Sequence, residues 1–384
     1  MLSNQKELFK LPETVTYLNG AYMSPLLRSV EKIGHEAVSA KCLPYEITAE
    51  DFFIGTEKLK RTFASFIDAP DYQNTAIIPS VSYGIATVAN NVKLQVGDEI
   101  ILANAQFPSN VYAWQKIAEK YKAKIKVVDP PNTFQNRGKI WNQSILDAIT
   151  NKTALVAISP AHWADGTLFD LKAIRAKTKI CNALLIIDGA QSLGALPFSI
   201  KEIEPDAVIT VGYKWLLGPY GLGMAYYADT FNEGEPLENN WINRHNSEDF
   251  TQLVNYNPNY QPKAGRYNMG ECSNFNLVPM LTKSIEQLAE WQPKNIQTYC
   301  DAITKNAIDE LRKLGCFVED DMHRAKHLFG VYLPATIDLD KLKAEFNKQN
   351  IYVSFRGNAI RVSPNVYNSE SDFEKFVACF RKIK

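Results

Sequence analysis

Three polar side chains follow short apolar runs of this sequence, and their types could bind an anion, accept a proton and act as a nucleophile. Ser82 comes soon after TAIIP, Asp188 ends ALLIID, and Lys214 lies in GYKWLLGPYGLG directly after AVITV. Lysine is almost never fully buried without a partner. Lys214 is therefore either an ordinary residue at a strand end or an amine held out of water, where it loses its proton more easily and can act as a nucleophile.

The elements that must position these residues are seven short apolar runs between residues 75 and 227. Helical periodicity separates the first six runs, which predicts an α/β fold with a mostly parallel seven-stranded sheet flanked by helices. Nearly unbroken apolar runs predict strands buried on both faces. Ligands of such sheets bind at the carboxyl ends of the strands, where these polar residues lie. The runs are TAIIP, EIILA, KIKVVD, ALVAIS, ALLIID, AVITV and GLGMAYY.

Taken together, the three groups predict a site for pyridoxal 5'-phosphate. The amine of Lys214 forms a Schiff base with the aldehyde of the cofactor, and the carboxylate of Asp188 keeps the pyridine nitrogen protonated. Val81 and Ser82 open a predicted helix whose backbone N–H groups bind the phosphate. Taken singly, a serine here is more simply an N-cap, and Asp188 could cap the next turn. GPYGLG does not match the glycine fingerprint of a nicotinamide-nucleotide site.

The remaining third of the chain predicts a second, smaller lobe. Residues 231–262 form a long polar connection, and predicted helices and strands follow from residue 277. We expect an N-terminal segment over residues 1–20, a large cofactor-binding domain over 21–275 and a small C-terminal α+β domain over 276–384.

Composition excludes several classes of protein. Lysine plus arginine number 42, as do aspartate plus glutamate, so we expect no nucleic-acid partner. The polar start MLSNQKELFK and the lack of a long apolar run favour neither a secretory signal nor a membrane protein. Six scattered cysteines indicate free thiols in the cytoplasm. HRAKH (323–327) lacks the glutamate of HExxH, so we expect a solvated face there and no metal site.

From YLNGAYMSP (17–25) to IRVSPNVYN (360–368) the chain resembles the class V aminotransferases, and DGAQ followed by TVGYKWLLGPYGLG carries the resemblance most specifically. These are pyridoxal-phosphate enzymes of fold type I, including cysteine desulfurases, kynureninases and isopenicillin N epimerase-like proteins. The resemblance implies that Lys214 also shuttles the Cα proton. It further implies that Gln191 lies near the phenolic oxygen of the cofactor and that Tyr213 contacts its phosphate or ring.

The same resemblance implies a set of further contacts. Phe107 would stack on the cofactor ring, and its side chain cannot transfer protons. Arg361 would bind the substrate carboxylate, with Arg356 as a second choice. Asn19 would contact the substrate, and His162 in SPAHWADG is an acid–base candidate, although a lone histidine is more often structural.

The resemblance also implies a homodimer with shared active sites. The aromatic, Asn-rich stretch around Trp241 and Asn243 could reach the neighbouring site. Glu271 stands where the family often has a phosphate-binding threonine, and a carboxylate there would repel phosphate. The backbone at Gly270 or the hydroxyl of Ser273 could replace that contact.

The predicted function is chemistry at the α-amino group and Cα of an amino-acid substrate, by transamination or by β- or γ-elimination. Epimerisation or racemisation is an alternative, and so is a regulatory protein that binds the cofactor without turnover. SFRGNAIRVSP (354–364) leaves no room for the mobile cysteine loop that desulfurases use. We therefore expect negligible cysteine desulfurase activity.

Overall fold

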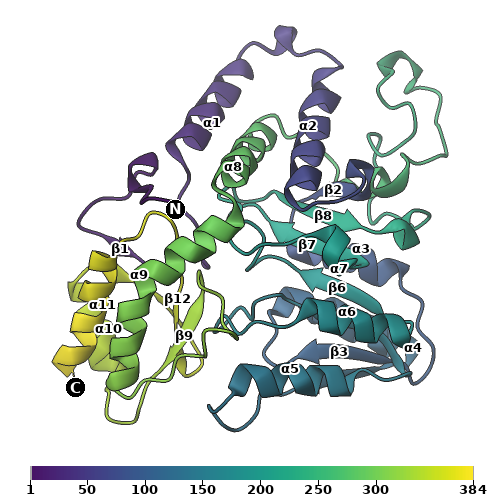
Figure 1. Cartoon of the computed structure of the whole chain (residues 1–384). Coiled ribbons are helices and arrows are strands. Elements are labelled where there is room, and N and C mark those ends of the chain that lie inside the picture. Colours follow the sequence, from purple (N-terminus) through teal and green to yellow (C-terminus); the bar gives the residue numbers. More distant parts are fainter. Residues whose placement is uncertain (1, 384) are drawn as a thin grey trace.

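A seven-stranded sheet forms the centre of the computed structural model, which describes residues 2–383 (Figure 1). The strand order is β2-β8-β7-β6-β5-β3-β4, and β8 runs antiparallel to both of its neighbours, β2 and β7. The predicted mostly parallel sheet is therefore confirmed. Its strands are β2 (Thr75–Ile78), β3 (Glu99–Ala103), β4 (Lys124–Val128), β5 (Thr153–Ile158), β6 (Leu184–Asp188), β7 (Ala207–Val211) and β8 (Gly223–Tyr227).

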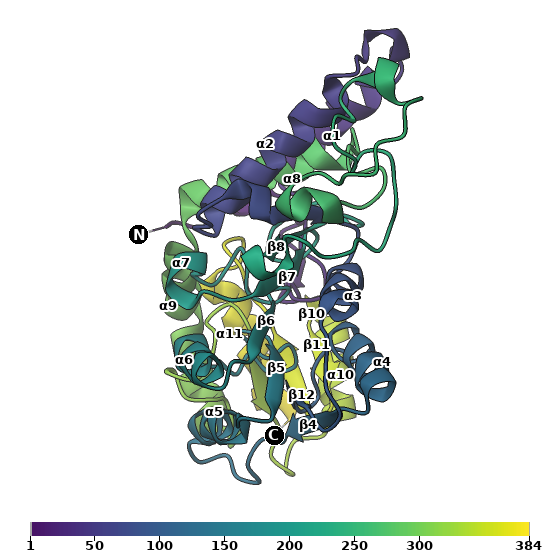
Figure 2. The same cartoon turned by 90° about the vertical axis from the view of Figure 1, so that its right-hand side faces the viewer.

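Helices cover both faces of this sheet, as Figure 2 shows. On one face, α3 (Val81–Asn91) and α4 (Tyr112–Tyr121) bury apolar side chains against the strands. On the other face lie α5 (Arg137–Ala148), α6 (Leu171–Ile180) and the one-turn α7 (Ile200–Ile203). Two apolar cores thus enclose the sheet, which fixes the strand ends that carry the candidate residues.

The edge strand β4 departs from the predicted burial. Of its five residues only Val128 is buried, and Lys124 and Val127 are exposed. The reason is its position, because β4 pairs only with β3 among the described strands and ends the sheet. An apolar run alone does not reveal whether its strand is central or at the edge.

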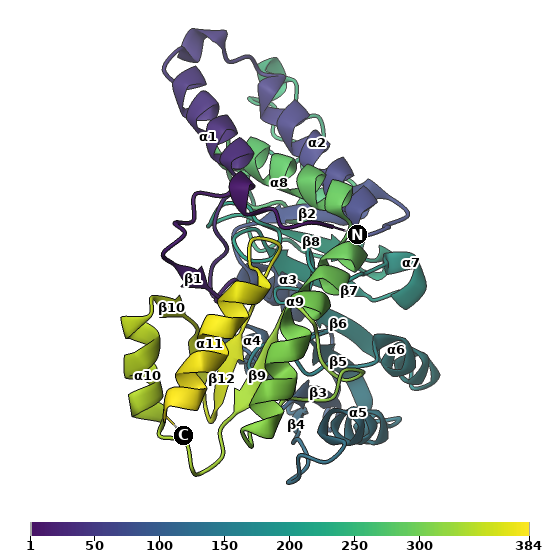
Figure 3. The same cartoon turned by 60° about the vertical axis from the view of Figure 1, so that its left-hand side comes forward.

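Two helices that the sequence analysis did not predict project from the body as a hairpin (Figures 1 and 3). These are α1 (Arg28–Ala40) and α2 (Asp51–Phe66), and both pack against α8 (Leu277–Trp291). The start of the predicted helical stretch at residue 277 is confirmed. The hairpin and α8 therefore form one group of packed helices.

The C-terminal elements form a three-stranded antiparallel sheet with helices against it; the sequence predicts its strands and helices but not their pairing. The sheet order is β11-β12-β9, with β9 (Phe329–Tyr332), β11 (Ser354–Arg356) and β12 (Ala359–Val362). The helices are α9 (Pro293–Lys313), α10 (Leu339–Lys348) and α11 (Glu370–Ile383). The domain boundaries at residues 20 and 275 remain predictions.

Both ends of the chain meet at this lobe. Strand β1 (Thr16–Tyr17) pairs in parallel with β10 (Ile351–Tyr352), and Asn19 bridges to Ser363. The N-terminal stretch that contains Asn19 is therefore held against the segment that carries Arg361.

The HRAKH segment is not the solvated face that we expected. It contains no helical residues, and His327 and Arg324 are buried. Arg324 is accommodated because it pairs with Asp321 (2.8 Å) and approaches Asp301 (3.7 Å). Within residues 2–383 there is no cluster of three or more His, Cys, Asp or Glu side chains arranged to hold a metal ion. No helix in that range is long and apolar enough to cross a lipid bilayer.

Candidate active site

A cavity of about 280 Å³ opens at the carboxyl ends of the central strands and brings most of the predicted site together. Trp163 and Tyr220, which the sequence analysis did not select as site residues, also line it. Asn19, His162 and Arg361 are not among the lining residues. The predicted residues that do line it are Val81, Ser82, Phe107, Asp188, Gln191, Tyr213 and Lys214.

Lys214 is an amine held out of water, and the loop between β7 and β8 positions it. Its side chain is buried, and desolvation lowers its pKa to about 8, although the nearby Asp188 carboxylate opposes that change. Its Nζ lies 5.2 Å from the ring centroid of Phe107 and 5.5 Å from that of Tyr213. The loop turns tightly at Gly212, where an added Cβ would lie 2.8 Å from the carbonyl oxygen of Leu222.

Asp188 ends β6 and is the carboxylate of the cavity. Only 3% of it is exposed, and burial raises its pKa because the charged form is poorly solvated. The backbone N–H of Ala190 donates to its Oδ1 (3.0 Å), and that bond and the charge of Lys214 oppose the rise. The two groups therefore interact electrostatically across the cavity, although they form no direct ion pair among the described contacts.

The start of α3 is the predicted anion site. Ser80 is its N-cap, with Oγ accepting from the backbone N–H of Tyr83 (3.2 Å) and lying 2.9 Å from Oγ of Ser82. The N–H groups of Val81 and Ser82 come before the first intrahelical hydrogen bonds, so they remain available for an anion at the positive end of the helix. The capping and anion-binding interpretations are thus compatible.

Gln191 is held by contacts on both ends of its amide. Its Nε2 donates to the carbonyl oxygen of Ala21 (3.1 Å), and its Oε1 accepts from Nε1 of Trp215 (2.9 Å). Nε2 of His327 donates to the backbone oxygen of Gln191 (2.8 Å), and Nδ1 accepts from Gln297 (2.8 Å). Burial lowers the pKa of His327 to about 4, which keeps it neutral.

His327 is a positioning residue that the sequence analysis missed. Its ring also packs edge-on against Trp215, with centroids 4.4 Å apart. The only sequence signal was its place in HRAKH, whose polar composition favoured the surface. Its partner Gln191 lies 136 residues earlier in the chain, so no local pattern could have joined them.

Arg361 and Asn19 lie together beside the cavity. Arg361 on β12 is buried and its Nη1 donates to the carbonyl oxygen of Trp163 (3.1 Å). Its Nη2 is 3.5 Å from Oγ of Ser354, and that hydroxyl donates to Oδ1 of Asn19 (2.7 Å). Trp163 connects this group to the cavity, since its ring packs edge-on against Phe107 with centroids 5.4 Å apart.

His162 is not brought into the cavity, so we withdraw it as a substrate-binding or acid–base candidate. Its Nδ1 lies 3.2 Å from the carboxylate of Asp165, and its Nε2 donates to the carbonyl oxygen of Asn104 (3.1 Å). Its ring packs against Trp141. With both nitrogens occupied, His162 anchors the segment that carries its neighbour Trp163.

The residues considered as replacements for the missing threonine have other partners in this chain. The backbone N–H of Gly270 donates to the carboxylate of Glu238, and the hydroxyl of Ser273 donates to the carbonyl oxygen of Phe52. Neither group is free to bind a phosphate in this arrangement. Glu271 itself is exposed.

The prediction that the stretch around Trp241 and Asn243 reaches a neighbouring site remains a prediction, but within this chain the side chain of Asn243 has other partners. This residue is fully buried, and its Nδ2 donates to the carbonyl oxygens of Glu238 (2.9 Å) and Arg266 (3.2 Å). Trp241 is half-buried and packs edge-on against Phe52, with centroids 5.9 Å apart.

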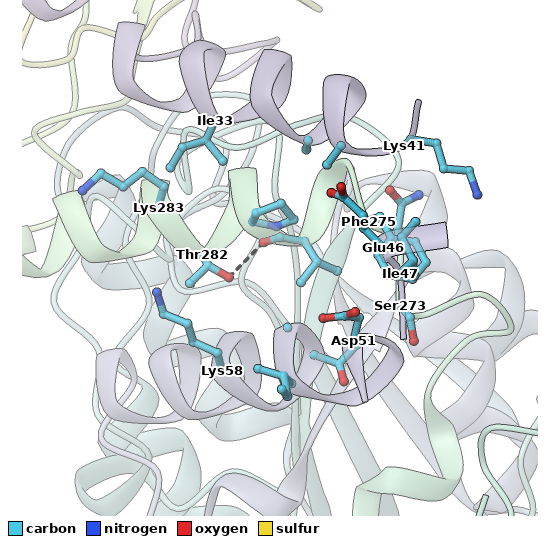
Figure 4. A pocket seen from close by; sticks show the side chains of 18 of the residues that line it. Ile33, Lys41, Glu46, Ile47, Asp51, Lys58, Ser273, Phe275, Thr282 and Lys283 are labelled. Atoms are coloured by element: carbon cyan, nitrogen blue, oxygen red, sulfur yellow. Dashed lines mark hydrogen bonds between the residues drawn. The ribbon is translucent and has the colours of Figure 1, made fainter. Parts of the chain in front are cut away.

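A larger hollow of about 530 Å³ lies elsewhere, between α1, α2 and α8 (Figure 4). Ile33 and Phe275 are among its apolar lining residues, and the side chains of Lys58 and Lys283 lie along it. Of the residues that the sequence analysis considered for the site, Ser273 lines this hollow, whereas none of the residues that line the Lys214 cavity does.

Comparison with known proteins identifies the family. The chain is 24% identical to a probable cysteine desulfurase of Borreliella burgdorferi (97% of this chain, 89% of that protein). It is 23% identical to the uncharacterised aminotransferase YcbU of Bacillus subtilis (96% and 94%). The solved cystine C–S lyase C-DES, in complex with cysteine persulfide, has a TM-score of 0.85 at 18% identity (97% and 98%).

The cysteine desulfurase CsdA of Escherichia coli has a similar fold, with a TM-score of 0.82 at 18% identity (98% of this chain, 97% of that one). These likenesses agree with a fold of type I. The model of the family described as aminotransferase class V matches residues 46–376. The chain therefore belongs to the class V aminotransferases, a family of pyridoxal-phosphate-dependent transferases and lyases.

Proposed function

We propose that this protein is a pyridoxal-phosphate enzyme that acts at the α-amino group and Cα of an amino-acid substrate, by transamination or by β- or γ-elimination. One observation carries the proposal. A buried lysine without an ion-pair partner among residues 2–383 shares a cavity with a buried carboxylate and with the free start of a helix. An amine, an acid and an anion site are the three groups that this cofactor needs.

The residues present fit the cofactor. Lys214 would hold its aldehyde carbon, Asp188 its ring nitrogen, and the N–H groups of Val81 and Ser82 its phosphate, with Phe107 against the ring face. When bound, the cofactor supplies an electron sink for the charge left on Cα after a bond there breaks.

The chain itself supplies the proton chemistry. With a pKa of about 8, Lys214 is partly neutral near neutral pH and can accept a proton from Cα. Phe107 can orient a ring but cannot move a proton. Arg361, with its planar guanidinium fixed by the carbonyl oxygen of Trp163, would orient the substrate carboxylate.

Reductive trapping tests the cofactor assignment. The purified protein should be yellow, and borohydride should fix the chromophore covalently to the peptide that contains Lys214. A Lys214→Ala variant should lose this label, whereas Lys60→Ala, which removes another buried lysine, should keep it. A colourless protein, or a label on a different peptide, would overturn the proposal.

A panel of amino acids, followed by spectroscopy and mass spectrometry, identifies the reaction. Transamination leaves a keto acid and converts the chromophore to its amine form. Elimination releases ammonia together with a keto acid such as pyruvate. Inversion at Cα without net product would favour the epimerase alternative, and a coloured protein inert to the whole panel would favour a regulatory role.

We further propose that cysteine desulfurase activity is negligible. None of the six cysteines lines the Lys214 cavity, and four of them are buried. The segment before Arg361 is the hairpin of β11 and β12, whose strands are only two residues apart. Mass spectrometry after incubation with cysteine should find no persulfide on the protein, and its accumulation would contradict this expectation.

The quaternary structure and location that we propose are a homodimer in the cytoplasm. Exposed apolar side chains at Ile54, Val254 and Tyr256, on α2 and the long connection, support an interface there. Light scattering should give twice the mass of the chain. A fully active monomer would refute the dimer, and cell fractionation tests the location.

A further inference from the structure

Arg361 differs from the other buried arginines of the chain. Arg137, Arg266 and Arg324 each lie within 4 Å of at least one carboxylate oxygen. No carboxylate in residues 2–383 lies within that distance of Arg361 or of the half-buried Arg356. The Nε atoms of both residues are buried and lack a hydrogen-bond partner among the described residues. Two positive charges are therefore left without a counterion.

The hairpin of β11 and β12 places these two charges on one face. Ser354 pairs directly with Arg361, and Arg356 pairs with Ala359. Residues opposite each other in an antiparallel pair share a face, as do residues two apart along a strand. Arg356 and Arg361 are thus diagonal neighbours on the same face.

The face that carries both arginines also meets the cavity. The Cζ atoms of Arg356 and Arg361 lie 5.4 Å and 5.9 Å from the ring centroid of Trp163, which lines the cavity. Both charges are close enough to Lys214 to help lower its pKa, and Arg356 helps to lower that of Arg361. The substrate side of the site thus has an excess of positive charge.

We infer that the substrate is an amino dicarboxylic acid, with Arg361 binding its α-carboxylate and Arg356 its side-chain carboxylate. This inference rests on the proposed function. A single carboxylate would neutralise one guanidinium and leave the other desolvated beside it, which is costly. A substrate with two carboxylates neutralises both, and charge-assisted hydrogen bonds to each give the selectivity. Arg356 is then a specificity-determining residue.

Kinetics of the holoenzyme on aspartate, glutamate and alanine test this inference. We expect kcat/KM to be higher on aspartate or glutamate than on alanine. Arg356→Gln should lower kcat/KM on the acidic substrate by about 10- to 100-fold. The kcat/KM of this variant on alanine should stay within roughly threefold of the wild-type value. Arg28→Gln is the matched control, because Arg28 is a surface arginine that also has no carboxylate oxygen within 4 Å in the described chain. It should change neither value.

Binding provides a readout that does not depend on turnover. Calorimetry with succinate and with butyrate should show tighter binding of succinate, and Arg356→Gln should remove most of that difference. If Arg356→Gln lowers kcat/KM equally on acidic and neutral substrates, both arginines bind one carboxylate and the inference is overturned. Turnover restricted to neutral amino acids, without succinate selectivity, also overturns it but leaves the proposed function intact. Succinate selectivity without trapping at Lys214 refutes the proposed function and supports the pairing of Arg356 with a second carboxylate.

Discussion

Replacing Asp188 by asparagine should make the amine of Lys214 a weaker base. Desolvation alone draws the lysine pKa down from 10.5, and the attraction of Asp188 is what keeps it as high as about 8. An opposite charge within about 4–6 Å changes a pKa by roughly 1–3 pH units, or about 1.4–4 kcal/mol. We therefore expect the pKa of Lys214 to fall by roughly 1–3 pH units in Asp188→Asn.

This substitution is conservative in shape. The amide oxygen of asparagine can still accept the hydrogen bond that the N–H of Ala190 donates to Asp188. The neutral fraction of Lys214 at pH 7 should rise from about one tenth to half or more.

Competitive acylation of the cofactor-free protein measures this pKa directly. Trace acetic anhydride is added between pH 5 and 11, and the extent of labelling at each lysine is read by mass spectrometry. Lys263 is an internal reference because it lies away from the cavity. Its ion pair with Asp71 (2.7 Å) raises its pKa, and the substitution should leave that pKa unchanged. If Lys214 titrates at the same or a higher pH in the variant while Lys263 is unchanged, the reasoning is refuted. Asp188 would then already be neutral in the wild-type protein.

Three further predictions concern the framework of the site. Asp165→Asn replaces the carboxylate that pairs with the buried Arg137 (3.0 Å) by a neutral amide, so the free energy of unfolding should fall by about 3–5 kcal/mol. A loss below about 1 kcal/mol in urea titrations would mean that this ion pair does not stabilise the fold. Gly166→Ala places a Cβ 1.9 Å from the carbonyl oxygen of Leu328 at a φ of 74° and should lower the melting temperature; an unchanged melting curve would be inconsistent with this geometry. Ser80→Ala removes the N-cap of α3, so the free energy of unfolding should fall by about 1 kcal/mol and cofactor titrations should show weaker binding. Unchanged stability and affinity would show that this cap contributes to neither.

The central sheet could be predicted from the sequence because its strands are apolar and short. Strand ends then marked Asp188 and Lys214, since these polar types are unusual beside buried strands. The helices α1 and α2 were not predicted. Burial within the sheet was also not predictable, since the apolar run of β4 looks like those of the central strands although it ends the sheet.

The surroundings of the site depend on contacts between distant segments, which no local pattern encodes. His162 and His327 looked alike as isolated histidines, one in a family-like segment and the other in a polar one. In the structure, the ring nitrogens of His162 contact Asp165 and a backbone carbonyl oxygen. His327 instead donates a hydrogen bond to the backbone oxygen of Gln191, which lies far from it in the sequence.

The pairing of β1 with β10 has a consequence for biosynthesis. Residues 16–20 cannot pair with their partners at 350–363 until those partners have left the ribosome. The lysine and aspartate sides of the cavity can assemble once residue 227 has emerged, but the arginine side must wait for residues 350–363. A growing chain therefore passes through a stage at which it can present a reactive amine before it can select a substrate, which makes vitamin B6 loading and substrate recognition separable events in time.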